Sequence, residues 1–171
     1  MHWSEEIANR IKELGKQLDN DYKDKNPLFV CILKGSSIFF ADLVRAMTIS
    51  VDFDFMAISS YGCNTVSSGA VRLVKDLDTS IENRHVVIIE DIVDTGHTLT
   101  YLIKNLSTRQ PASLKICTLL NKECRREVKL TPDYVGFEID NYFVLGYGLD
   151  YAEKYRNLPE IGVLKPEIYT K

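Results

Sequence analysis

One segment near the middle of the chain constrains its fold more than any other, the residues 86–99 with the sequence VVIIEDIVDTGHTL. Four apolar residues predict a buried strand, and the adjacent acids Glu90 and Asp91 follow it directly. A short polar turn comes next, and we expect a helix to begin near Thr98. In an open α/β sheet, ligands bind outside the carboxyl ends of the strands, and the N–H groups of a helix N-terminus bind anions. The segment therefore predicts a phosphate site beside two carboxylates.

Length and charge set the broad class of the protein. A chain of 171 residues with 45% hydrophobic and 26% charged residues is typical of a soluble globular protein, and we expect a single domain over residues 1–171. The net charge of −3 argues against a basic surface for nucleic acid or membrane. No apolar run approaches the ~20 residues of a membrane span, and the polar opening does not resemble a signal peptide. We therefore expect a cytoplasmic protein.

Apolar strands alternate with helices along the chain, which favours βαβ units and a mostly parallel sheet flanked by helices. The strand at 51–58 alternates aromatic and acidic residues, so we expect its acids to face water. The polar stretch at about 59–70 is expected to be a loop. The expected strands are 28–33, 51–58, 71–74, 86–89, 114–120, 134–139, 143–146 and 161–164, and the expected helices are 4–18, 37–47 and 98–106.

The turn that follows the two acids has the composition of an anion site. It offers consecutive N–H groups, two hydroxyls and a glycine that permits close approach. It is not a P-loop, which needs glycine at position 91 and lysine at 97, where this chain has Asp91 and His97. Adjacent carboxylates repel each other unless they face a cation or hydrogen-bond donors. Asp94 lies in the turn, where its spacing to Gly96 and His97 permits it to cap the helix, a role that leaves its other atoms free for chemistry.

The pattern of the whole segment, ending in Asp-Thr-Gly-X-Thr, resembles the 5-phosphoribosyl-1-pyrophosphate motif of type I phosphoribosyltransferases. Among these it resembles the hypoxanthine-guanine enzymes most, from about Leu28 to Tyr169. The resemblance implies the type I phosphoribosyltransferase fold, with a small hood formed from the chain termini. It also implies a Mg²⁺-dependent purine salvage reaction, in which hypoxanthine or guanine becomes IMP or GMP and pyrophosphate is released. His97 departs from the several relatives that carry lysine or another residue there.

The resemblance also implies how the phosphoribosyl donor binds. Glu90 and Asp91 would bind the ribose hydroxyls, partly through metal-bound water, and Asp94 would take the proton from purine N7. The 5-phosphate would bind at Asp94, Thr95, Gly96, His97 and Thr98. Pyrophosphate would bind at Lys34 and Gly35, in a Leu-Lys-Gly-Ser motif whose Leu–Lys peptide can be cis, and at Ser60, Tyr61 and Arg156. Ser60 and Tyr61 would belong to a mobile lid over about 59–70.

The base would be held by a second group of residues, again by resemblance: Lys122, Phe143, Val144 and Asp150. Lys122 would donate to the 6-oxo group of the purine, and Phe143 would stack on its ring. Val144 would use its backbone groups, and Asp150 would join Glu90 and Asp91 in holding Mg²⁺. From the sequence pattern alone, Lys122 is typical of a solvated loop and Phe143 of a core residue.

Two other interpretations stay open. The first is the same fold acting on xanthine, adenine, uracil or orotate; Lys122 and Phe143 favour a 6-oxopurine, and the preference between xanthine and guanine stays open. The second is a regulator that senses metabolites and binds RNA or DNA, but the pair Arg125–Arg126 is too short to follow a phosphate backbone. We therefore expect small-molecule substrates as partners, with no nucleic acid and no membrane. By resemblance we also expect a homodimer or homotetramer.

Overall fold

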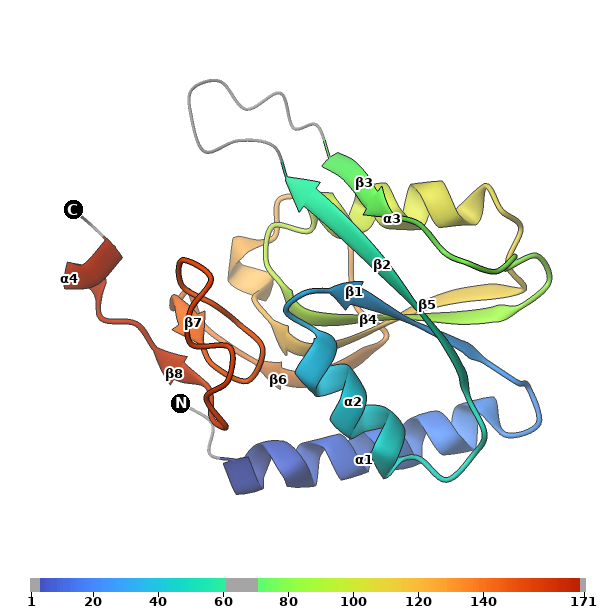
Figure 1. Ribbon diagram of the computed structural model, residues 1–171, viewed down its shortest axis with the longest axis horizontal. Helices are drawn as coiled ribbons and strands as arrows, with labels where there is room; N and C mark the ends of the chain where they lie inside the picture. Colours follow the sequence, from blue (N-terminus) through green and yellow to red (C-terminus); the bar gives the residue numbers. More distant parts are fainter. Residues whose placement is uncertain (1–3, 61–70, 170–171) are drawn as a thin grey trace.

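The apolar segments of the chain form one six-stranded sheet with the strand order β3-β2-β1-β4-β5-β6 (Figure 1). The structure is a computed structural model that describes residues 4–60 and 71–169. All neighbouring strands are parallel except β2 and β3, which confirms the mostly parallel sheet. The strands are β1 (Leu28–Leu33), β2 (Asp52–Ser60), β3 (Val71–Lys75), β4 (His85–Val93), β5 (Ser113–Asn121) and β6 (Tyr134–Glu138).

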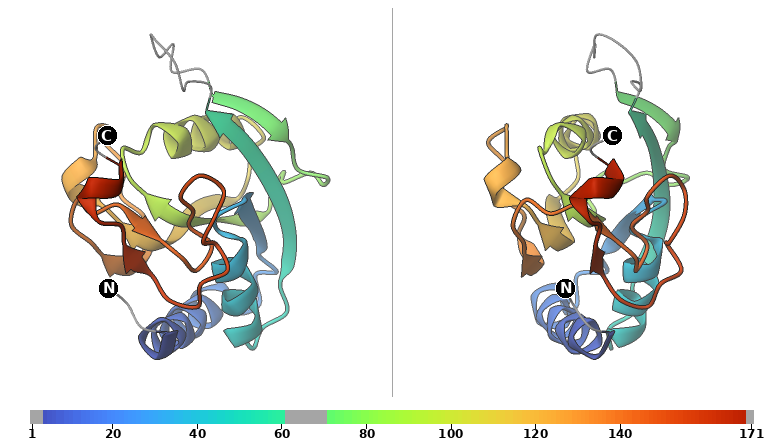
Figure 2. Two further views of the ribbon diagram at one scale, coloured as in Figure 1. Left: turned by 60° about the vertical axis from the view of Figure 1, so that its left-hand side comes forward. Right: turned by 90° about the vertical axis from the view of Figure 1, so that its left-hand side faces the viewer.

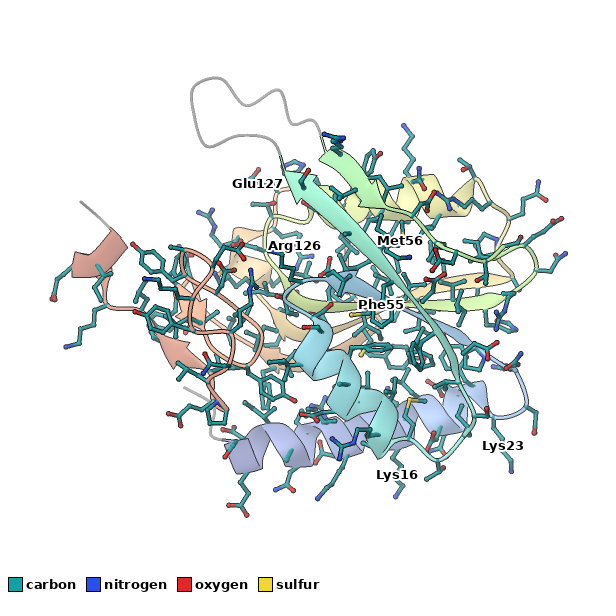
Figure 3. All side chains as sticks on the ribbon, viewed as in Figure 1. Lys16, Lys23, Phe55, Met56, Arg126 and Glu127 are labelled. Atoms are coloured by element: carbon teal, nitrogen blue, oxygen red, sulfur yellow. The ribbon has the colours of Figure 1, made fainter. Side chains whose placement is uncertain are left out.

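Helices cover both faces of this sheet. The helices α1 (Ser4–Tyr22) and α2 (Ser37–Ala46) lie on one face, and α3 (His97–Ser107) lies on the other (Figure 1). Because side chains alternate along a strand, each strand contributes to two cores. The neighbours Phe55 and Met56 of β2 lie on opposite sides of the sheet (Figure 3), in the α1–α2 core and the α3 core respectively. Burial on both faces explains the continuous apolar runs of β1 and β4.

Strand β4 is longer than its apolar run predicts, and this places the two acids. Pairing of β4 with β1 ends at Ile89, whereas pairing with β5 continues to Val93. Glu90 and Asp91 therefore lie inside β4, just past the point where β1 stops pairing with it. The Asp91 carboxylate consequently stands beside Gly35, in the turn that follows β1.

The expectation that the acids of β2 face water is wrong for Asp54. Its side chain is only 6% exposed, whereas Phe53 is 55% exposed. The segment after β3 returns over Asp54, whose carboxylate accepts hydrogen bonds from the Asp78 N–H and, on its other oxygen, from the Phe55 N–H. Lys75 adds a contact of 3.5 Å. Burial raises the pKa of this carboxyl, but the two hydrogen bonds and Lys75 outweigh it, so the pKa is lowered overall. The alternation of residues could not show this segment folding back.

A small hood stands at the carboxyl end of the parallel strands (Figure 2). It holds the antiparallel pair β7 (Val144–Leu145) and β8 (Gly162–Val163) and the short helix α4 (Pro166–Tyr169). Helix α1 packs on the sheet beside α2, and its first turns reach the hood, since Ser4 and Ile7 line one groove together with Leu158 and Pro159. The C-terminal segment thus makes more of the hood than α1 does. Among the described residues, no helix is long and apolar enough to cross a membrane.

Candidate active site

The turn between β4 and α3 encloses a small cavity at the carboxyl edge of the sheet. The helix begins at His97, and Gly96 precedes it with φ +88°, a conformation that favours glycine. The cavity, of about 120 Å³, is lined by Glu90, Ile92, Val93, Asp94, Thr95, Gly96, Thr98 and Leu99. These residues include most of the predicted phosphate site. Gly96 takes the capping position of α3, and the Asp94 carboxylate accepts from Arg125 rather than from an N–H of the helix, so the helix-cap interpretation of Asp94 is wrong.

A larger groove, of about 690 Å³, lies elsewhere, between α1, α2 and the hood. Its lining is mostly apolar and includes Ile7, Ile11 and Leu158, with Asp42 and Arg45 at its polar part. None of the predicted site residues lines it. The chemistry therefore favours the cavity between β4 and α3 as the candidate active site, although it is the smaller space.

Asp94, which lines this cavity, contacts two cations. Its carboxylate lies 3.6 Å from Lys122 Nζ and 3.4 Å from Arg125 Nε. Lys122 is only 7% exposed, and its backbone N–H donates to the carbonyl of Val93, so the solvated-loop interpretation of Lys122 is wrong. The end of β5 thus brings an ammonium beside the acid at the end of β4.

Glu90 and Asp91 form an electrostatically unfavourable pair. Both retain some exposed surface, but protein atoms replace much of the water around them. Burial and the adjacent charge of Asp91 raise the pKa of Glu90 well above its ordinary value. Burial raises the pKa of Asp91 to about 6, with Asp150 adding to it and the hydrogen bond from the Ile92 N–H opposing it. A cation or a set of donor groups placed here would stabilise both carboxylates.

The turn after β1 packs directly against Asp91. The Leu33–Lys34 peptide is cis, and Gly35 is so close to Asp91 that an added Cβ would lie 1.7 Å from its Oδ2. On the other side, an added Cβ at Gly148 of the hood would lie 2.1 Å from the Gly35 carbonyl oxygen. The turn is thus enclosed between the end of β4 and the hood, with no room for a larger residue.

We expect Gly35→Ala to lower the free energy of unfolding by about 1–3 kcal/mol, the usual cost of overpacking. For a domain of this size, this corresponds to a melting temperature lower by roughly 2–4 °C per kcal/mol. Thermal unfolding measures it. Gly162→Ala is the matched control, since an added Cβ there meets nothing within 4 Å. Equal melting temperatures for the two variants would contradict the close packing of Gly35 on Asp91.

Two cations of the predicted pyrophosphate site share a carboxylate. Glu153 lies 2.9 Å from Lys34 Nζ and 3.4 Å from Arg156 Nη2. Arg156 also contacts Asp150 at 2.8 Å and donates to the carbonyl of Gly148. The second oxygen of Asp150 accepts the N–H of Glu153. The hood therefore brings Arg156 and Asp150 to the turn after β1, where Lys34 lies.

Phe143 and Val144 lie at the start of the hood. Phe143 is 37% exposed, so the core interpretation of this residue is wrong. Its ring packs against that of Tyr151 in a T-shaped contact, with 5.7 Å between centroids. Val144 belongs to β7 and pairs with Val163 of β8. A partly exposed aromatic ring braced by a second ring is a suitable stacking surface for a flat base.

The described residues contain no group of three or more His, Cys, Asp or Glu side chains placed to hold a metal ion together. This does not conflict with magnesium chemistry. Mg²⁺ is commonly bound by one or two carboxylates with water and substrate phosphates completing its shell. Asp150 and Asp91 are near enough for their charges to interact, and both supply oxygen ligands of the type that Mg²⁺ prefers.

Comparison with known proteins agrees with this arrangement. Residues 3–152 match the phosphoribosyl transferase domain family. The chain is 53% identical to the hypoxanthine-guanine phosphoribosyltransferase of Bacillus subtilis, over 96% of this chain and 92% of that protein. The chain belongs to the hypoxanthine-guanine phosphoribosyltransferase family. A hypoxanthine phosphoribosyltransferase structure from Staphylococcus aureus superimposes with a TM-score of 0.95 and 49% identity, covering 100% of this chain and 93% of that one.

The chain also matches a longer protein of the same family. It is 51% identical to the bifunctional protein TilS/HprT of Listeria monocytogenes, over 98% of this chain. It spans only about a quarter of that relative, 26% of its length. The phosphoribosyltransferase family therefore occurs both as a chain of about this length and as part of a larger protein.

The predicted site residues of this family member fall mostly together. The carboxyl ends of β4 and β5, the turn after β1 and the hood bring them to one edge of the sheet. Ser60 ends β2, and Tyr61, with most of the expected lid, lies outside the described residues. Sequence reasoning did not single out Glu153, which contacts Lys34 and Arg156. Glu153 lies in an exposed turn with no pattern of its own.

Proposed function

We propose that this chain transfers the phosphoribosyl group of 5-phosphoribosyl-1-pyrophosphate to hypoxanthine or guanine. The observation that supports this best is the buried Lys122 beside Asp94, at the mouth of the cavity between β4 and α3. Family membership supports the same reaction. We further propose that residues 1–171 act as one domain and that the protein is a homodimer or homotetramer.

The proposed reaction joins purine N9 to C1 of the ribose while the bond from C1 to pyrophosphate breaks. Asp94 would take the proton from N7 as the base becomes positive. Lys122 and Arg125 contact the Asp94 carboxylate and would hold it beside the cavity that it lines. A positioned base of this kind contributes roughly 10²–10⁴ in rate. No covalent intermediate is needed, because positioning and charge stabilisation do the chemistry.

The donor would lie along the edge of the sheet. Its 5-phosphate would bind the N–H groups of the turn at Thr95–Thr98, and its hydroxyls would bind Glu90 and Asp91. Pyrophosphate would bind at the turn after β1, where it would replace Glu153 as the partner of Lys34 and Arg156. Mg²⁺ bound through Asp150, and through Asp91 and Glu90 by way of water, would neutralise the leaving pyrophosphate.

Base choice would rest on Lys122. A buried ammonium donates hydrogen bonds and accepts none, so it suits the 6-oxo group of hypoxanthine or guanine. The 6-amino group of adenine is also a donor and would leave both groups without a partner. An unpartnered buried donor costs about 1–3 kcal/mol. We therefore expect the preference for hypoxanthine or guanine over adenine to be of this size.

The test is a comparison of five bases with the same donor and Mg²⁺: hypoxanthine, guanine, xanthine, adenine and uracil. We expect nucleotide from hypoxanthine and guanine at rates at least about tenfold above those from adenine and uracil. The rate with xanthine shows how this base ranks against hypoxanthine and guanine, which the site residues leave open. Activity with adenine or uracil alone would overturn the base assignment. Donor binding without turnover of any base, together with a salt-sensitive gel shift of RNA or DNA, would favour the regulator instead.

A further inference from the structure

Arg126 lies behind the turn that would hold the 5-phosphate. Its guanidinium donates to the carbonyls of Leu130 at 3.2 Å and Val93 at 3.3 Å, and to Asn121 Oδ1 at 2.5 Å. Its stem packs on Gly96, since a Cβ added to Gly96 would lie 3.1 Å from Arg126 Cδ. In Figure 3 Arg126 and its neighbour Glu127 lie toward the carboxyl edge of the sheet. One side chain thus joins the end of β4, the end of β5 and the phosphate turn.

The charge of Arg126 has no carboxylate partner in the described part of the chain. All three of its acceptors are neutral oxygens, and its Nε is buried without a hydrogen-bond partner. The nearest acid along the network is Glu138, which accepts from the Asn121 amide group and not from Arg126. Arg126 is half-buried, and partial burial of an unpaired cation is costly, so its place beside an anion site calls for a physical reason.

The phosphate turn itself is poor in free cations. His97, at the start of α3, lies 2.8 Å from Glu127, and Lys122 and Arg125 both face Asp94. The carboxylates Glu90 and Asp91 stand at the same edge and would repel a dianion. The negative charge of these two acids would therefore oppose the binding of phosphate at the N–H groups of the turn, unless a positive charge nearby offsets it.

We infer that Arg126 supplies this charge and fixes the turn, as a positioning residue for the 5-phosphate. Its guanidinium holds the carbonyl of Val93, directly before the turn, and its stem packs on Gly96 within it, so the turn is braced at two points. Its unpaired charge, close to Gly96, offsets the acids nearby and favours a dianionic group in the cavity. The inference rests on the proposed function, because it takes the group that binds there to be the donor's 5-phosphate.

The test separates the phosphate from the rest of the substrate. We expect Arg126→Gln to raise the KM for the phosphoribosyl donor by about tenfold. The KM for hypoxanthine should change by less than about twofold. The Kd of IMP, which carries the same phosphate, should rise in parallel, while the Kd of pyrophosphate should not change. Lys129→Gln is the matched control, since Lys129 is exposed in the same segment, and we expect parental constants.

A second variant tests the charge without removing the arginine. The double substitution Asn121→Asp with Glu138→Gln exchanges the amide and the carboxylate of this pair. The amide at position 138 can then donate to the carboxylate at position 121, which can still accept from Arg126. The net charge and one of the two hydrogen bonds between positions 121 and 138 are kept, but a negative charge moves next to the guanidinium. We expect the donor KM to rise by about threefold or more, with the melting temperature near the parental value. This variant keeps the inference testable if Arg126→Gln does not fold.

Two results would overturn the inference. The first is a donor KM within about twofold of the parent in both variants. The second is an equal rise in the Kd of IMP and of pyrophosphate, because that would indicate a general loss of structure. Failure of the proposed function looks different, since the parental protein would then form no nucleotide at all.

Discussion

Replacement of Asp94 by alanine is expected to lower kcat for IMP formation by roughly 10²–10⁴, the contribution of a positioned general base. The donor KM should stay within a few-fold of the parental value, because the phosphate turn and the turn after β1 do not depend on the Asp94 carboxylate. Steady-state rates with hypoxanthine and the phosphoribosyl donor measure both quantities. Asp94→Asn should lose a similar factor, since an amide of the same size cannot take a proton.

Asp52→Asn is the control for this substitution. Asp52 is an acid at the opposite, amino end of β2, where it pairs with Arg84 on the surface, and such exposed pairs contribute little. We expect its rates to equal those of the parent. An Asp94→Ala protein that turns over hypoxanthine as fast as the parent would exclude Asp94 as the base. A fall in donor affinity without a fall in kcat would give Asp94 a binding role instead.

Replacement of Lys122 by methionine is expected to lower kcat/KM for hypoxanthine by about 5- to 150-fold, the equivalent of losing a hydrogen bond worth about 1–3 kcal/mol. Methionine keeps the length and the apolar stem of the side chain but removes the donor. Adenine should lose less than hypoxanthine, so the preference for hypoxanthine over adenine should shrink. Initial rates with the two bases at saturating donor measure this ratio.

The control for Lys122 is Lys129→Met, which removes an exposed ammonium from the neighbouring segment. It should leave the ratio between the two bases unchanged. Binding of pyrophosphate should also stay unchanged in Lys122→Met, because Lys34 and Arg156 lie in other elements. A Lys122→Met protein with the parental preference for hypoxanthine would contradict the role of Lys122 in base choice.

The core of the site could be predicted from the segment 86–99, because the residues that form it are close to one another in the sequence. A buried strand, two acids, a tight turn and a helix follow each other within this one short segment, so the cavity between β4 and α3 could be expected from local sequence. The alternation of strands and helices likewise predicted the parallel sheet. The length of β4 could not be read from its apolar run, because pairing with β5 continues past the two acids.

What could not be predicted depends on residues that are distant in sequence. The burial of Asp54 arises from the segment that folds back after β3, and neither element shows it alone. Lys122 looks like a loop lysine until the ends of β4 and β5 are placed side by side. Arg126 looks like part of a solvated charge run, and only its three acceptors from separate segments show that it is half-buried and held between them.

The central claim is that the edge of the sheet near Asp94 transfers a phosphoribosyl group to a 6-oxopurine. The most direct measurement is the amount of hypoxanthine consumed and of IMP and pyrophosphate formed by the purified protein with the donor and Mg²⁺. We expect equal amounts of all three, with formation stopped by removal of Mg²⁺. A folded protein that binds the donor but forms no IMP, or that releases pyrophosphate without forming a nucleotide, would contradict the claim.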